Sequence, residues 1–278
     1  MSLQAEKKKR NWIIFIVLLL GIIVINFPII WIFFTSIKPK EFIESTTPVW
    51  LFKPNFAHYA GLFSHEGEFN FFLYFSNSLI ISISATFLAM FIAYPAAYSI
   101  ARYRTLGDNY SFFVLSIRMI PPIIFIIPIS ILFALYRLTD TRIGIILIYL
   151  TFNIPFACWI IKSFIEDIPE DLERAAYMDG YSHLQVMTKI IFPLTKSAVA
   201  AVAIICFIFS WNEFLFALIL SFIKSVTLTA GAAQFVTGYG IRWGMISAAT
   251  VIAIIPTIIV GLIGQRFLVR GLTMGAVK

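Results

Sequence analysis

The stretch from Glu166 to Pro193 reads EDIPEDLERAAYMDGYSHLQVMTKIIFP and is the one long polar run with an apolar segment on each side. Six of the fourteen acidic residues of the chain lie in it. Pro169 suits the first position of a helix, the following acids suit the positive end of the helix dipole, and Gly180 suits the C-terminal stop. The residues therefore predict a short helix that ends at a glycine corner.

A second helix is predicted directly after this corner. Ser182 and Gln185 have the spacing of a capping box, which typically opens a helix. Pro193 marks the far end of this second helix. The first helix is amphipathic, since its apolar residues share one stripe with acids around it; they are Ile168, Leu172, Ala175 and Ala176.

The composition of the whole chain indicates a membrane protein. Hydrophobic residues make up 60% and charged residues 13%, with a mean hydropathy of +0.92, whereas a soluble domain has about a quarter charged residues. The net charge of +7 is spread between apolar segments, which argues against nucleic-acid binding. Cys158 and Cys206 lie inside apolar segments without metal or redox spacing, so no disulfide framework is expected.

The apolar segments have the length that a bilayer requires, about 20 residues. The first follows Lys7–Arg10 and is too long for a cleaved signal peptide, so we interpret it as a retained span. The sequence therefore predicts a single all-α membrane domain, residues 1–278, with six transmembrane helices at 12–36, 71–101, 110–136, 143–165, 198–222 and 244–267.

The distribution of basic residues predicts the orientation in the membrane. Six spans place both termini on the side of the loop 166–195, and thirteen of the 21 Lys and Arg residues fall on that side. Cytoplasmic loops carry such an excess, so both termini and this loop are expected in the cytoplasm. The outer loops are 37–70, rich in aromatic residues that suit headgroup anchoring or a docking surface, and 223–243.

ATP hydrolysis is not expected on this chain. No Gly-Lys dipeptide occurs, which excludes a Walker A phosphate loop, and His58, His65 and His183 form no metal-binding motif. No catalytic or metal site is predicted. Energy for active transport would have to arrive through another chain, and the loop 166–195 is the best-equipped surface to receive it.

The order of residues in this loop resembles a known motif. Glu173-Arg174-Ala175-Ala176, then Asp179-Gly180, then Ile190-Ile191-Phe192-Pro193 is similar to the cytoplasmic EAA loop of permease subunits in ABC importers, although Arg174 stands where that family usually has Ala. The resemblance implies that the first helix sits in a groove of an ATPase subunit. Glu173, by itself typical of a solvated helix acid, would meet a basic residue there, Ala175 and Ala176 would permit close approach, and Gly180 would form the corner.

Further runs resemble the MalG-type subunit of carbohydrate importers from Asn77 onward. They are Asn77-Ser78-Leu79, Arg118 to Pro122, Ser210 to Phe214 and the tail Arg270 to Lys278, which is implied to touch the ATPases. The resemblance implies the type I ABC importer permease fold in a prokaryotic inner membrane. It also implies a second, different permease, an ATPase dimer that binds ATP and Mg²⁺, and an extracytoplasmic sugar-binding protein.

Two sets of residues are predicted to meet the solute or its carrier. Polar groups within spans are expected to face the bundle interior, either as lining of a pathway or as buried anchors between helices; they are Asn77, Arg118, Asn153, Asn212 and Glu213. In the family resembled, the last outer loop reaches the sugar cleft of the binding protein. The residues expected to do so are Gln234, Gly238, Tyr239 and Gly240.

The leading functional hypothesis is therefore half of the pore of an ATP-driven sugar importer. The alternatives are a secondary transporter, which would need an internal repeat with broken helices in matching positions, and a self-standing channel. Neither alternative accounts for an acidic, alanine-rich helix with a glycine corner in the cytoplasm.

Overall fold

A computed structural model describes residues 2–64, 69–105, 116, 119–238 and 240–274, with side chains described between residues 11 and 265. Its secondary structure is mostly helical. Contacts divide the chain into two units, one of residues 1–69 with 235–252 and one of residues 70–234 with 253–278. Among the described residues, the larger unit contains a bundle of packed helices.

Five helices in the described part of the chain are long and apolar enough to cross a membrane. They are Asn11–Ser36, Phe71–Tyr103, Arg142–Glu166, His183–Asn212 and Trp243–Gln265. The predicted span 110–136 lies partly outside the described residues. Its described part contains the 3-10 helix η1 (Pro122–Phe125) and helix α6 (Ile126–Leu135), which together are shorter than a bilayer requires.

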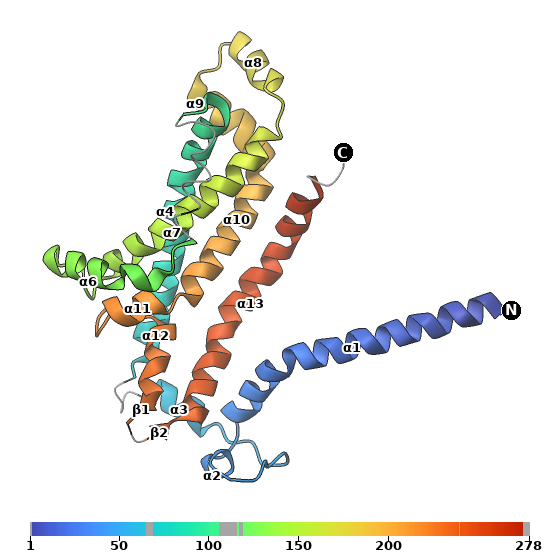
Figure 1. Cartoon of the computed structure of the whole chain (residues 1–278), viewed down its shortest axis with the longest axis vertical. Helices are drawn as coiled ribbons and strands as arrows, with labels where there is room; N and C mark the ends of the chain where they lie inside the picture. Colours follow the sequence, from blue (N-terminus) through green and yellow to red (C-terminus); the bar gives the residue numbers. More distant parts are fainter. Residues whose placement is uncertain (1, 65–68, 106–115, 117–118, 239, 275–278) are drawn as a thin grey trace. The chain divides into compact units, whose positions relative to one another are not determined.

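The larger unit is built around three helices that lie side by side, α4 (Phe71–Tyr103), α7 (Arg142–Glu166) and α10 (Phe192–Asn212) (Figure 1). Helix α4 carries alanines at every fourth position, which share one face of a helix; they are Ala85, Ala89, Ala93 and Ala97, all fully buried. Small residues at this spacing let helix backbones approach closely in a membrane. The alanine face therefore explains why α4 packs tightly against α7.

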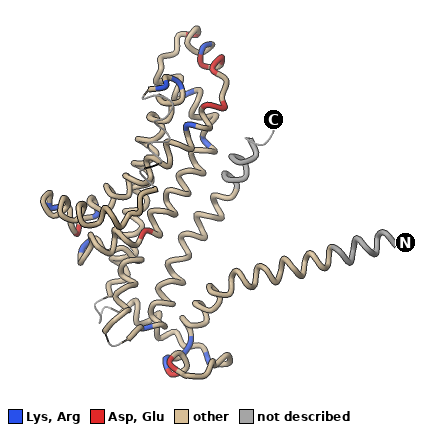
Figure 2. Tube along the Cα trace, in the orientation of Figure 1, with Lys and Arg blue, Asp and Glu red and all other residues tan. Residues whose placement is uncertain are grey.

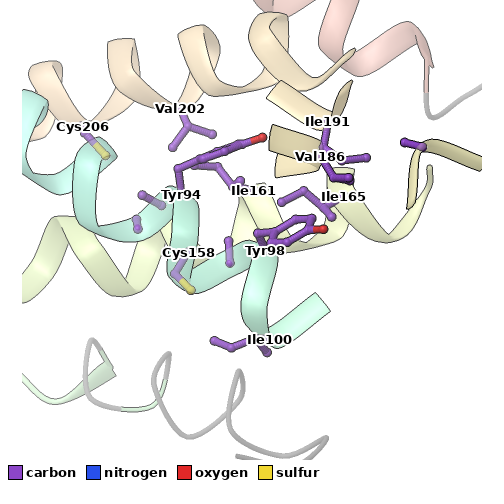
Figure 3. Packing of buried hydrophobic residues seen from close by; sticks show 14 residues of the cluster. Tyr94, Tyr98, Ile100, Cys158, Ile161, Ile165, Val186, Ile191, Val202 and Cys206 are labelled. Atoms are coloured by element: carbon purple, nitrogen blue, oxygen red, sulfur yellow. The ribbon is translucent and has the colours of Figure 1, made fainter. Parts of the chain in front are cut away.

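One end of this bundle contains a cluster of buried residues that joins the three helices to the loop 166–195. Tyr94 and Tyr98 of α4 lie against Ile161 and Ile165 of α7 (Figure 3). Val186 and Ile191, from the segment just before α10, close the cluster, and Val202 and Cys206 extend it along α10. The loop is therefore packed against the end of the bundle.

The predicted boundaries of the fifth span are wrong. The helix begins at α9 (His183–Gln185), continues through the π-helix η2 (Val186–Ile191) and ends as α10 at Asn212. After a break at Glu213, the short helix α11 (Leu215–Leu220) covers most of the rest of the segment predicted as 198–222. The carboxylate of Glu213 caps the start of α11 at this break.

Pro193 does not end the second helix, as the sequence predicted, but lies in the first turn of α10. Proline lacks the N–H and its ring clashes with the carbonyl four residues earlier in an ordinary α-helix. The wider π turn before it avoids both problems, because the N–H of Phe192 donates to the carbonyl of Met187, five residues earlier. The chain therefore passes Pro193 without a break.

Asp140 links the loop after α11 to the loop before α7 through hydrogen bonds. Its carboxylate accepts hydrogen bonds from the backbone N–H groups of all four residues 222–225 and from the hydroxyl of Ser225, at 3.0–3.2 Å. Its own N–H donates to the carbonyl of Leu220 (2.8 Å). Helix α12 (Leu228–Ala232) follows this loop.

The smaller unit contains α1 (Ser2–Ser36), α2 (Lys40–Ile43), α3 (Ala57–Phe63) and residues 243–252 of α13 (Trp243–Met274). It also holds a two-stranded antiparallel hairpin, β1 (Val236–Thr237) and β2 (Gly240–Ile241), which departs from the predicted all-α class. Among the described side chains of α1, only Ser36 is buried. The apolar surface of α1 is thus available for lipid or for another chain.

Candidate functional site

The polar loop contains the short helix α8 (Asp171–Met178), which lies beyond one end of the three-helix bundle (Figure 1). It begins two residues after Pro169, since its first backbone bonds run to the carbonyls of Pro169 and Glu170. Acidic and basic residues gather at this end of the bundle, while the long helices are mostly uncharged along their length (Figure 2). The acids of the loop are therefore concentrated around α8.

The predicted glycine corner is confirmed. Gly180 has φ +84°, and two backbone bonds close the helix: the N–H of Gly180 donates to the carbonyl of Tyr177 (3.0 Å) and that of Tyr181 to the carbonyl of Ala176 (3.1 Å). This is the Schellman arrangement, which requires a left-handed residue at the position of Gly180. The capping box of Ser182 and Gln185 is also confirmed, with both reciprocal hydrogen bonds present.

We expect Gly180→Ala to lower the stability of the loop by about 1 kcal/mol, because L-residues other than glycine are strained in the left-handed region. No neighbouring atom lies within 4 Å of a Cβ at this position, so the cost is conformational and not steric. The melting temperature Tm of the purified protein measures it. Gly238→Ala is a matched control, since that glycine is also unobstructed but has no positive φ; equal shifts of Tm in both variants would contradict the prediction.

The carboxylate of Glu173 points into its own chain and not outward. Glu173 is only 5% exposed, and its Oε1 pairs with Nε of Arg102 from α4 at 2.5 Å. The hydroxyl of Tyr98 donates to its Oε2 at 2.7 Å. Arg102 also donates to the carbonyl of Ile168 at 2.8 Å. The basic residue that meets Glu173 in this structure is therefore Arg102, and the acid ties α8 to the end of α4.

Further hydrogen bonds extend this connection to α9. Nδ1 of His183 lies 2.9 Å from the hydroxyl of Tyr103 and 3.0 Å from that of Tyr177. The hydroxyl of Tyr177 in turn lies 3.3 Å from that of Tyr98. No local motif predicts the contacts from Tyr98 and Tyr103 of α4, because their partners are about 80 positions later in the sequence.

The opposite face of α8 is exposed and carries apolar side chains beside the acid Asp171. Leu172, Ala175 and Met178 follow one another at three-residue spacing, which places them on the same face of a helix. Met178 is 88% exposed. Ala176, in contrast, is buried against the cluster beneath the helix. Ala175 and Ala176 therefore lie on different faces of the helix. We call Leu172, Ala175 and Met178 the outer face of α8.

Two of the predicted pathway residues, Asn77 and Asn212, form hydrogen bonds within the chain. Asn77 is fully buried, donates to the carbonyls of Lys224 and Val226 (2.9 Å each), and accepts from Nε of Arg142 (2.7 Å). The Nδ2 of Asn212 donates to a carbonyl of its own helix. Arg118 lies outside the described residues.

Asn153 and Glu213 border one cavity of about 240 Å³ in the larger unit. Asn153 donates to Oγ of Ser210 at 2.8 Å, which links α7 to α10. The carboxylate of Glu213 accepts from the N–H groups of Phe216 (3.0 Å) and Ala217 (3.2 Å) and so caps α11. The aromatic residues Tyr149, Phe152, Phe209 and Phe216 complete most of the lining.

The residues predicted to contact a binding protein fall in two places. Gly238 and Gly240 are exposed at the turn of the hairpin, whereas Tyr239 lies outside the described residues. Gln234, in the larger unit, exchanges hydrogen bonds with the hydroxyl of Tyr74 at 3.2–3.3 Å. Among the described residues, no group of three His, Cys, Asp or Glu side chains could hold a metal ion.

The chain is similar in sequence to known proteins. Residues 85–274 match the family model described as the inner membrane component of binding-protein-dependent transport systems. A probable ABC transporter permease of Sinorhizobium fredii is 37% identical over 252 residues, with 91% of this chain and 90% of that protein covered. The trehalose transport system permease protein of Mycobacterium tuberculosis is 34% identical over 283 residues, with 99% and 100% covered.

A solved structure supports the fold. The crystal structure of a bacterial ABC transporter that imports alginate contains a chain with a TM-score of 0.74 at 24% identity, with 93% of this chain and 97% of that chain covered. The family match covers most of the chain and includes α8, Gly180 and Pro193. The chain therefore belongs to the family of inner membrane components of binding-protein-dependent transport systems, and it is a multi-pass permease subunit of the inner membrane.

Proposed function

We propose that this permease forms half of the translocation pathway of an ATP-driven importer for a sugar or oligosaccharide that a binding protein delivers. A relative named for trehalose transport, at 34% identity over nearly the whole of both chains, supports the solute class. The partners would be a second, different permease, an ATPase dimer that carries ATP and Mg²⁺, and the sugar-binding protein. Six spans with both termini in the cytoplasm would place α8 on the side where ATP is.

The observation that carries the coupling role is the two-faced character of α8. Its outer face presents the exposed apolar side chains of Leu172 and Met178, which suit a docking surface, while Glu173 on the other face is fixed to Arg102 and Tyr98 of α4. A displacement of α8 by an ATPase subunit would therefore reach α4 through a buried ion pair. In this scheme Glu173 transmits the movement to α4 within the chain.

The remaining residues of the motif position α8 and connect it to its neighbours. Ala175 lets the ATPase approach the outer face, and Ala176 lets α8 approach the bundle. Asp179 ends the helix and Gly180 makes the corner, while Pro193 and the π turn before it connect the loop to α10.

The solute would pass the cavity bordered by Asn153 and Glu213, while Asn77 holds the loop that follows α11. Gln234 and the hairpin turn with Gly238, Tyr239 and Gly240 would meet the binding protein. The exposure of Gly238 and Gly240 supports this role.

Cysteine crosslinking tests the docking of α8. We expect Met178→Cys to crosslink to an ATPase subunit in the assembled importer, because Met178 is exposed on the outer face. The native Cys158 and Cys206 are buried, so the background reaction is low. Ile223→Cys, exposed in the loop after α11, is the matched control and should not crosslink. Failure of Met178→Cys to crosslink in an importer that still transports would refute the docking.

A further inference from the structure

Lys38 is a buried cation for which the described part of the chain supplies no ionic partner. It follows α1 by two residues and is only 7% exposed. Among the residues that the structure describes, none of the ion pairs includes it: the neighbouring Lys40 pairs with Glu44, and the other pairs lie in the larger unit. An unpaired buried charge is costly, so a partner for Lys38 is expected from outside the described chain.

Two aromatic rings hold the ammonium in place without neutralising it. Nζ of Lys38 lies 5.2 Å from the ring centroid of Trp31 and 5.3 Å from that of Phe52. Cation–π contacts of this kind stabilise the position of a cation. Its charge remains available to an anion.

Lys38 lines a mostly apolar cavity in the smaller unit, with a volume of about 490 Å³. The walls come from the end of α1, from α2 and the segment after it, and from the start of α13. The indole rings of Trp31 and Trp243 contribute apolar surface, and Thr46, Thr47 and Ser247 contribute hydroxyl groups. One cation, several hydroxyls and aromatic walls suit an anionic group that carries an apolar portion.

We propose that this cavity binds the phosphate group of a membrane phospholipid, with Lys38 as its cation. Lys38 lies just beyond the membrane-spanning segment Asn11–Ser36, at the level where lipid headgroups and tryptophans are found. An ammonium is a compact point charge that binds phosphate well. The site is independent of the proposed transport function, since it requires only the membrane location.

The surroundings favour a lipid over a soluble anion. The cavity wall includes Trp31 and Ile32, which also belong to the spanning helix. The exposed apolar surface of α1 continues from this wall along the span, through residues such as Phe27 and Phe34. A phospholipid could therefore place its phosphate beside Lys38 and its acyl chains along α1, where they bury apolar surface.

Native mass spectrometry of the purified, delipidated importer with short-chain phosphatidylglycerol tests the proposal. We expect one lipid to bind per copy of this chain, and Lys38→Met to weaken binding about tenfold or more, as expected for loss of a charge-assisted bond. Lys38→Arg should retain binding, which separates loss of charge from misfolding. Lys53→Met, an exposed lysine of the same outer loop, is the matched control and should bind as the wild type does.

Two other probes distinguish the source of the anion. Dioctanoylglycerol lacks the phosphate and should not compete, and inorganic phosphate should compete only at far higher concentration. Equal binding by Lys38→Met and the wild type would overturn the site. Competition by inorganic phosphate at the concentration of the lipid would overturn the lipid assignment, and a folded importer that binds no lipid would show that a partner chain fills the cavity.

Discussion

Glu173→Lys is expected to abolish solute uptake while the chain still inserts into the membrane. The substitution places an ammonium against Arg102 in a site that is almost fully buried. Breaking a buried ion pair costs about 3–5 kcal/mol, and repulsion between two cations adds to this. We expect α8 to lose its attachment to α4, so that ATP hydrolysis no longer drives transport. Uptake into proteoliposomes and the ATPase rate of the same preparation measure this uncoupling.

Two controls separate the buried pair from general charge effects. Glu170→Lys changes the same charge on an exposed acid next to α8 and should leave uptake close to that of the wild type, since exposed pairs contribute about 0–1 kcal/mol. The exchange Arg102→Glu with Glu173→Arg restores opposite charges and should recover part of the uptake. Normal uptake by Glu173→Lys would exclude the coupling role of this residue.

Asp140→Ala is expected to produce a large loss of thermal stability. It removes the acceptor for the backbone N–H groups of residues 222–225 and leaves these donors unpaired in the loop. A hydrogen bond to a charged group contributes about 1.5–3 kcal/mol, and the contributions of several such bonds do not simply add. The Tm of the protein in detergent should therefore fall by several degrees. Asp171→Ala, at a highly exposed acid, is the control and should leave Tm unchanged.

The stability that Asp140 provides should depend on pH. Burial alone would raise the pKa of this carboxyl, but hydrogen bonds from the N–H groups of Phe222, Lys224, Ile223 and Ser225 outweigh it and hold the pKa below its ordinary value. A lowered pKa in the folded state means that the stabilisation is complete above the unfolded pKa of about 3.9 and is lost as the pH falls through the folded value.

The contribution of Asp140 to the wild-type Tm should therefore be constant between pH 5 and pH 7, a range in which the carboxyl is ionised in both states, and should decline below about pH 4. Asp140→Ala should lack this part of the acid-dependent decline. A difference in Tm between the two proteins that stays constant down to the acid limit of folding would contradict the lowered pKa.

Features that depend on neighbouring residues could be predicted from the amino-acid sequence. Gly180 ends α8 because only a residue without Cβ adopts its φ without strain, and Ser182 with Gln185 opens the next helix through bonds that span three residues. Hydrophobic composition likewise determined the membrane class, since no packing information is needed to count apolar residues.

Tertiary structure alone decided which side chains meet. Glu173 pairs with Arg102, 71 positions earlier, and Asn77 bonds to the loop that Asp140 also holds, about 150 positions later. The structure also places the end of the fifth span at Asn212 and carries the helix past Pro193 through a π turn. Local hydrogen bonds specify helix ends and corners. Residues far apart in the sequence come together only when α4, α7 and α10 pack. That packing decides that Glu173 faces its own chain and not a partner subunit.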